Sequence, residues 1–152
     1  MIDLDLIGKK YGPISFEYTW KDVVLYAMSI GAQADELPFI YENAKGGLRV
    51  FPSFSVVMGI GLFIELFKDM KVDFSRFIHG EQAIKLYRPI PPEGKTLLEG
   101  RITNIYDKGK GALIVWRMKV MTEGGEPLGE AGGLASGVAR ARLRLPASAN
   151  GA

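Results

Sequence analysis

The chain has 152 residues, the length of one domain, and its 47% apolar and 24% charged residues are ordinary for a globular protein. A net charge of only +2, without a clustered basic face interleaved with aromatic residues, argues against a nucleic-acid-binding protein. The absence of cysteine excludes disulfides, thiolate metal sites and cysteine nucleophiles, and the single histidine excludes a histidine-rich metal site.

Neither end of the sequence matches a known targeting signal. The first residues, Met-Ile-Asp-Leu-Asp-Leu, lack a secretory pattern, and the last three, Asn-Gly-Ala, are not a peroxisomal signal, so a cytoplasmic location is the prediction. We expect one domain over residues 1–146 and a small, polar, frayed tail over residues 147–152.

The first predicted element is a helix from Trp20 to Ile30. Thr19 is a suitable N-cap, and Asp22, three residues later, favours the positive end of a helix. Apolar residues then recur at helical spacing as far as Gly31, which can end the helix. The sequence next predicts a loop over residues 33–36, a short strand over 38–42 and a turn over 44–47.

The most distinctive stretch runs from Val50 to Phe67. Pro52 or Ser53 can open a helix, and from Phe54 onward apolar residues fall at every angle of a helical wheel. A membrane span is disfavoured because polar residues and glycines interrupt the run, which is shorter than about 20 apolar residues. A helix that is apolar all round must be buried all round, so we expect a curved sheet to wrap it.

Two glycines interrupt this predicted helix. Gly59 and Gly61 weaken a helix by roughly 1 kcal/mol each relative to alanine. Their presence predicts that a strand or a ligand approaches the helix very closely there.

Beyond the central helix the apolar period changes from about 3.6 to 2, which indicates strands. The first two predicted strands are residues 80–88 and 96–107. The third has Ile114, Trp116, Met118 and Val120 on one face. In the last, the apolar residues Ala139, Ala141, Leu143 and Leu145 alternate with Arg140, Arg142 and Arg144. Turns are predicted at residues 91–95, 108–111 and 124–125. Long antiparallel strands after one buried helix predict an α+β fold, a single hot-dog domain in which the sheet wraps the helix.

Candidates for catalysis are scarce, and each has a structural alternative. His79 and Glu81 form an acid/base pair if they share one face of a strand, whereas the alternative is a histidine satisfied by hydrogen bonds. Ser53 and Ser55 are nucleophiles only beside a base and are otherwise helix caps. The glycine-bearing turn at residues 108–111 and the arginines of the last strand suit phosphate, or are a plain hairpin turn and a solvated face.

The central helix also offers an apolar surface. Its Met and Phe residues are either plain core or the wall of a tunnel for an apolar chain. Met58 is the residue we expect to line such a tunnel, because it precedes Gly59 and its side chain is adaptable. The members of this surface are Phe51, Phe54, Met58, Phe63 and Phe67.

Six segments of the chain resemble one known family and occur in its order, over about residues 13 to 125. The segments are Tyr18 to Ala32, Phe39 to Glu42, Phe51 to Val57, Ile78 to Gln82, Arg88 to Pro91 and Tyr106 to Ala112. They resemble the enoyl-CoA hydratase 2 family, the MaoC-like hydratase unit also found in peroxisomal multifunctional enzyme type 2.

The resemblance implies a double hot-dog enzyme that adds water to trans-2-enoyl-CoA to give the (3R)-hydroxyacyl-CoA. This chain is similar to the N-terminal half, which in the family lacks the catalytic residues and houses the acyl tail. The catalytic half carries an Asp-x-Asn-Pro-x-His motif, which maps onto nothing here.

We therefore predict a non-catalytic, acyl-CoA-binding hot-dog subunit, with no cofactor and no catalytic residue of its own. Its catalytic Asp and His would come from a partner hot-dog subunit. The predicted substrate-binding residues are Phe51, Phe54, Met58, His79, Gly80 and Glu81. Two alternatives stay open: a non-catalytic acyl-CoA-binding or regulatory homodimer, and a hot-dog thioesterase that uses Glu65 or Glu81 as base.

Overall fold

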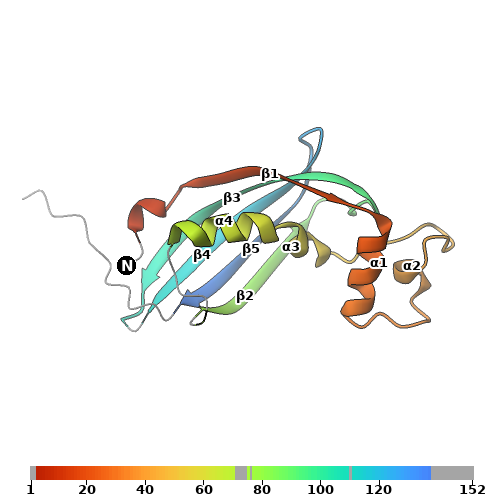
Figure 1. Ribbon diagram of the computed structural model, residues 1–152, viewed down its shortest axis with the longest axis horizontal. Coiled ribbons are helices and arrows are strands. Elements are labelled where there is room, and N and C mark those ends of the chain that lie inside the picture. The colour runs from red at the N-terminus through yellow and green to blue at the C-terminus, as the bar shows by residue number, and fades with distance from the viewer. Residues whose placement is uncertain (1–2, 71–74, 76, 110, 138–152) are drawn as a thin grey trace, which may run out of the picture.

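The computed structural model describes residues 3–70, 75, 77–109 and 111–137 (Figure 1). The predicted arginine-bearing strand and the tail over residues 147–152 lie outside the described residues. The helices are a short 3-10 helix at Leu4–Leu6, α1 at Trp20–Ser29, α2 at Leu37–Ile40, α3 at Phe54–Met58 and α4 at Ile60–Met70. The strands are β1 at Lys10–Tyr18, β2 at Phe77–Leu86, β3 at Gly94–Asp107, β4 at Ala112–Thr122 and β5 at Pro127–Gly137.

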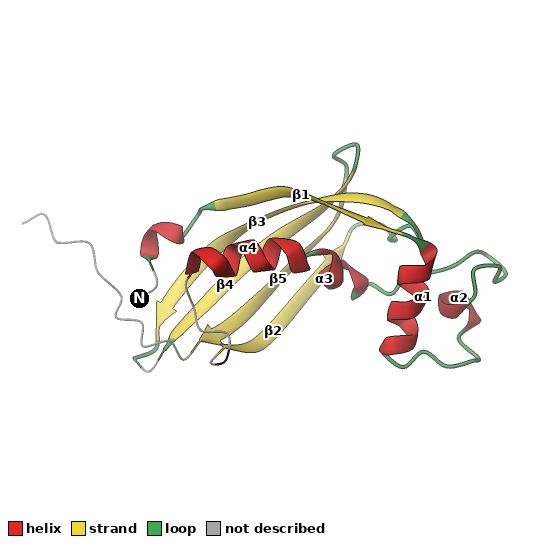
Figure 2. Cartoon of the chain, in the orientation of Figure 1, coloured by secondary structure: helices red, strands yellow, loops and turns green. Residues whose placement is uncertain are grey.

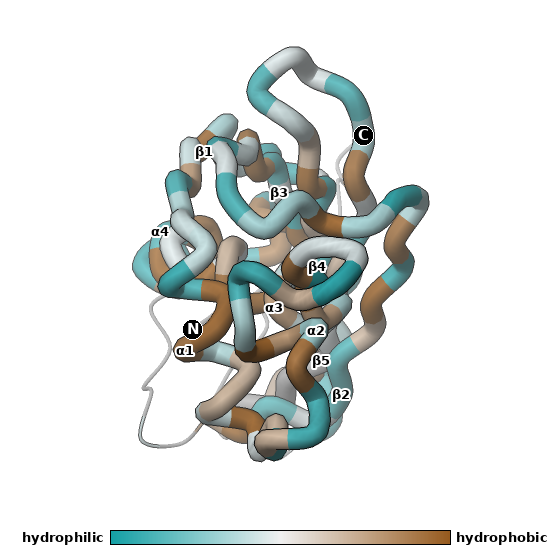
Figure 3. Tube along the Cα trace, turned by 90° about the vertical axis from the view of Figure 1, so that its right-hand side faces the viewer, coloured by the Kyte–Doolittle hydropathy of each residue, from teal (hydrophilic) through white to brown (hydrophobic). Residues whose placement is uncertain are grey.

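The five strands form one antiparallel sheet in the order β1-β3-β4-β5-β2. Helices α3 and α4 follow one another along one face of the sheet, while α1 and α2 lie beyond one end of it (Figure 2). This arrangement confirms the predicted α+β fold, an antiparallel sheet curved around a central helical segment. Polar and apolar residues alternate along the strands, as the teal and brown segments of Figure 3 show.

Helix α1 begins at Trp20, as predicted, and ends at Ser29, one residue before the predicted end at Ile30, which is its C-cap. The carboxylate of Asp22 accepts hydrogen bonds from the backbone N–H and the hydroxyl of Thr19, each at 2.8 Å. These bonds, the backbone one foremost, lower the pKa of Asp22. At the other end Gly31 takes a φ of +100°, and the Ala32 N–H donates to the carbonyl of Ala27 at 3.0 Å.

Three other segments differ from the sequence prediction. The prediction of a strand over residues 38–42 is wrong, because this segment contains the short helix α2. Pro38 occupies the first turn of that helix, where a backbone N–H has no partner within the helix and its absence costs nothing. Strand β1 escaped prediction because Gly12 and Pro13 interrupt its apolar alternation; proline is tolerated here because β1 is an edge strand. Strand β5 escaped prediction because its alternating buried positions Gly129, Ala131 and Gly133 carry small residues in place of larger apolar ones.

The central segment is two consecutive helices, not the one helix predicted from about Ser53 to Phe67. They meet at Gly59, where a Cβ would collide with the end of the Met118 side chain, which reaches over from β4. At the next contact Leu62 lies against Gly100 of β3, where a Cβ would lie 2.6 Å from Leu62 Cδ2. At Gly59 the close neighbour is therefore a side chain of strand β4, not the backbone of a strand. At Gly61 the nearest atom would be Ile14 Cγ2 at 4.0 Å, so nothing requires glycine there.

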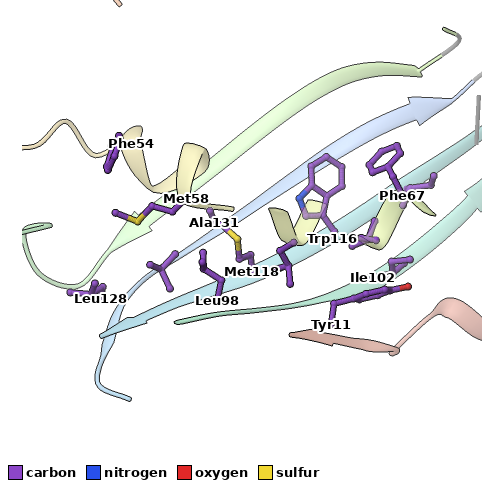
Figure 4. Close-up of a cluster of buried hydrophobic side chains, with 14 of the residues drawn as sticks. Tyr11, Phe54, Met58, Phe67, Leu98, Ile102, Trp116, Met118, Leu128 and Ala131 are labelled. Carbon is purple, nitrogen blue, oxygen red and sulfur yellow. The ribbon is translucent and has the colours of Figure 1, made fainter. Parts of the chain in front are cut away.

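The prediction that this segment is buried on every side is wrong. Its inner residues join the main core with Leu98, Ile102 and Met118 of the sheet (Figure 4). Its outer side is not covered, since Ile60 is 59% and Ile64 is 46% exposed. A single sheet can cover only one side of a helix, so the second side stays open in the isolated chain.

The two glycines give a matched stability test. Gly61→Ala should raise the free energy of unfolding by up to about 1 kcal/mol, because alanine favours a helix and meets no neighbour there. Gly59→Ala should lower it by about 1–3 kcal/mol, because Met118 must move. Denaturant titration of both variants measures the difference, and equal shifts would contradict the close approach at Gly59.

Candidate functional site

A cavity of about 220 Å³ lies between the two central helices and the sheet. We call it the inner groove. Its helical wall is mostly apolar and contains Val56, Val57, Ile60, Phe63 and Leu66. Its sheet wall contains Trp116, Met118 and Ala131, and it includes the backbone position Gly100. Two polar side chains of β2, His79 and Gln82, also line it, so the groove suits a mostly apolar ligand that carries a polar group.

A β-bulge at Gly80 brings these two polar side chains together. His79 is paired with Ala135 and Glu81 with Leu134, which leaves Gly80 as the extra residue of β2. Residues three apart in a regular strand lie on opposite faces. Here the bulge puts His79 and Gln82 on one face, with His79 Nε2 3.2 Å from Gln82 Oε1.

The same bulge separates His79 from Glu81. Glu81 lies with Lys85, Glu130 and Gly132 at a depression on the outer face of the sheet, whereas His79 faces the inner groove. The prediction that His79 and Glu81 share a face is therefore wrong, because a strand alternates regularly only where it has no bulge. The histidine is instead satisfied through Gln82, as the structural alternative held.

Gln82 is held firmly by the neighbouring backbone. Its amide nitrogen donates to the carbonyl of Gly132 at 2.9 Å and to its neighbour Ala83 at 3.2 Å. The His79 ring lies 5.7 Å from the Trp116 ring. Trp116 itself packs against Gly133, where a Cβ would collide with the indole. Gln82 was not among the predicted site residues, although a glycine inside the strand pattern is a signal for a bulge.

Three of the predicted binding residues, Phe51, Phe54 and Met58, are not among the residues that line the inner groove. Phe54 and Met58 are fully buried in the core (Figure 4). The ring of Tyr18 contacts Phe54, and burial raises the pKa of Tyr18 to about 12. Phe51 stacks on Phe39, with ring centroids 4.0 Å apart. Binding roles for Phe51, Phe54 and Met58 stay predictions, as do those for Gly80 and Glu81.

The serine candidates have structural roles or no partner base. Ser55 is buried, and its hydroxyl donates to the carbonyl of Pro52 at 2.8 Å. Ser53 occupies the N-cap position of α3 but makes no side-chain capping bond. Within the described part of the chain neither serine is hydrogen-bonded to a base, which leaves both without the activation that a nucleophile needs.

The remaining candidates are also placed away from the groove. The turn after β3 is the predicted hairpin turn, closed by a 2.8 Å bond from Lys108 N–H to the carbonyl of Gly111. Glu65 is exposed on α4 and does not line the groove. Over the described ranges, no three His, Cys, Asp or Glu side chains gather as metal ligands would. Of the helices described, none has both the length and the apolar character that a membrane span requires.

Comparison with known proteins matches this chain to one family and one fold. The sequence model of the family described as "MFE-2 hydratase 2 N-terminal domain" matches residues 16–131. The "Probable enoyl-CoA hydratase 2" of Dictyostelium discoideum is 35% identical over 114 residues, which are 72% of this chain and 38% of that protein. The chain thus spans about two-fifths of the length of that relative.

Two solved structures share the fold. The full-length peroxisomal multifunctional enzyme type 2 of Drosophila melanogaster matches with a TM-score of 0.70 and 27% identity, over 88% of this chain and 24% of that one. The HadBC (3R-hydroxyacyl-ACP dehydratase) complex of Mycobacterium tuberculosis matches with a TM-score of 0.75 and 16% identity, over 88% of this chain and 98% of that one. These likenesses confirm the hot-dog fold.

The contrast between core and groove positions can be tested directly. Met58→Trp should lower the free energy of unfolding by about 1–3 kcal/mol, because Met58 is 1% exposed and an indole overpacks the core. Ile60→Trp, two residues later, should leave it within about 0.5 kcal/mol, because that side chain is largely exposed. Thermal unfolding compares the two. An unchanged melting temperature for Met58→Trp would show that space for a ligand exists at Met58 after all.

Proposed function

The chain belongs to the family of the MFE-2 hydratase 2 N-terminal domain, and from this premise we propose that it is the acyl-binding hot-dog half of an (R)-specific 2-enoyl-CoA hydratase. Its ligand is then a coenzyme A thioester whose acyl chain lies in the inner groove. The observation that carries the proposal is the groove itself, which is apolar on its helical wall and polar at His79 and Gln82.

The chemistry of hydration supports a non-catalytic role for this chain. Adding water across a 2-enoyl thioester requires a base to activate the water and an acid to protonate the neighbouring carbon. No aspartate or glutamate is among the described residues that line the inner groove, and its one imidazole is hydrogen-bonded to an amide. The acid/base pair would therefore come from a second hot-dog unit on a partner chain.

The sheet offers a surface for such a partner. Among the described strands β2 lies at one edge of the sheet, and an edge strand can pair with a strand of a neighbouring sheet. The exposed side chains of Ile78 on β2 and of Ile60 and Ile64 on α4 leave apolar surface to cover. The HadBC dehydratase, which shares this fold, is itself a complex. A cytoplasmic location stays a prediction, since the family includes peroxisomal proteins.

Activity of the purified chain tests the division of labour. With trans-2-butenoyl-CoA (crotonyl-CoA), we expect no hydration above the uncatalysed rate, because the groove lacks an acid/base pair. The loss of absorbance of the conjugated thioester measures this, with a thioester hydrolysis assay alongside. Robust hydration that disappears in His79→Ala would make His79 the acid/base residue, and robust hydrolysis would favour the thioesterase alternative.

Binding as a function of chain length tests the groove. Each additional methylene buried should tighten binding by about 0.8 kcal/mol, about fourfold in Kd, until the groove is full. Ile60→Trp should abolish this gain because the indole fills the groove, whereas Ile64→Trp should preserve it because Ile64, one turn later, does not line the groove. Calorimetric titration of a saturated acyl-CoA series measures both. An affinity independent of chain length in the unmodified protein would mean that no acyl group binds there.

A further inference from the structure

The hydrogen bonds around His79 determine which of its two ring nitrogens carries the hydrogen. The Gln82 amide nitrogen donates to the Gly132 and Ala83 carbonyls at 2.9 and 3.2 Å, so Gln82 Oε1 is the atom that faces His79 Nε2. Turning the amide over would set its oxygen against the oxygen of Gly132, two acceptors without a hydrogen between them. Nε2 therefore carries the hydrogen and donates it to Gln82.

This assignment leaves the other nitrogen as an acceptor. A neutral imidazole with its hydrogen on Nε2 carries a lone pair on Nδ1. His79 is exposed and borders the inner groove, so Nδ1 is accessible to a molecule bound there. No partner of Nδ1 is found among the described residues.

The ring is also held in place. The bulge at Gly80 turns His79 toward the groove, Gln82 holds Nε2, and the Trp116 ring lies 5.7 Å away. Gln82 is fixed in turn by two backbone carbonyls, and Trp116 by its close packing on Gly133. A side chain whose tautomer and orientation are both set by its neighbours is suited to recognising one kind of ligand atom.

We propose that His79 Nδ1 accepts a hydrogen bond from an O–H or N–H group of the thioester ligand, next to the chain held in the inner groove. This rests on the proposed acyl-thioester function and deepens it. The two sources of such a donor are a hydroxyl on the acyl chain and the amide N–H of the thioester arm. Both are neutral donors, whereas a carbonyl oxygen at the same place would face a lone pair and be disfavoured.

The consequence is a preference among ligands of equal chain length. One hydrogen bond that forms in the complex and replaces water is worth about 2- to 12-fold in affinity. His79 thus serves as a specificity residue, favouring ligands with a donor over those with an oxygen acceptor at that position.

The test uses three thioesters with the same ten-carbon acyl chain. Decanoyl ethyl thioester has no donor, 3-hydroxydecanoyl ethyl thioester adds a hydroxyl, and decanoyl N-acetylcysteamine thioester adds an amide N–H. Because the chain has a single histidine, ¹⁵N NMR of labelled protein reads both ring nitrogens without ambiguity. Before ligand is added, Nε2 should have the shift of a protonated nitrogen and Nδ1 that of a nitrogen with a lone pair.

We expect the Nδ1 resonance to move with one donor ligand, which identifies the source, and not with the ligand that has no donor. His79→Phe should remove the 2- to 12-fold preference for that ligand, and His79→Asn should restore part of it, since its amide oxygen is again an acceptor. Lys85→Gln, exposed on the opposite face of β2, is the control and should change neither quantity. Gln82→Leu should allow the hydrogen to populate both ring nitrogens.

Different results overturn the two proposals. If all three thioesters bind through their chains but equally well, and Nδ1 does not move, the role of His79 is wrong and the acyl-binding function stands. A hydrogen on Nδ1 in the free protein would also overturn it. If none of the three binds, the acyl-binding function itself is wrong.

Discussion

The close approach of helix and sheet is the constraint on which the rest of this structure depends. At Gly59 and Gly100 the missing side chains let α3 and α4 settle onto β3 and β4, with Met118 and Leu62 filling the space. This contact fixes the depth of the core below it. The residues of this contact also line the inner groove, next to the point where Trp116 packs on Phe63 of α4 with ring centroids 5.2 Å apart.

The second determinant is one extra residue in an edge strand. Before Gly80, strand β2 has one set of side chains turned inward, and after Gly80 it has the other. His79 and Gln82 meet only because of this change. The groove therefore owes its apolar wall to packing and its polar pair to a local irregularity of the backbone, and the two together give it the character of a site for a chain with a polar head.

Periodicity predicted most of the fold, and its failures have physical causes. Helix α1 carries its own start and stop signals, and β4 alternates without interruption, so both were predictable from the sequence. Strands β1 and β5 were not, because Gly12, Pro13 and the small residues of β5 hide the alternation. At the site the motif His79-Gly80-Glu81-Gln82 was visible, but its pairing was not. A bulge exchanges the faces of a strand, and periodicity assumes that no such exchange occurs.

The bulge also links His79 and Gln82 to the core, and this link affects which sequence changes β2 can accept during evolution. Phe77 shares the inward face with His79 and packs on Phe67, with ring centroids 4.3 Å apart. Deleting Gly80 would restore regular alternation, and either Phe77 and His79 or Gln82 and the residues after it would turn outward. A point substitution in this strand changes one side chain, whereas deletion of one residue removes part of the core together with the contact between His79 and Gln82. Insertions and deletions are therefore expected to be selected against at this point of the strand far more strongly than in the loops around it.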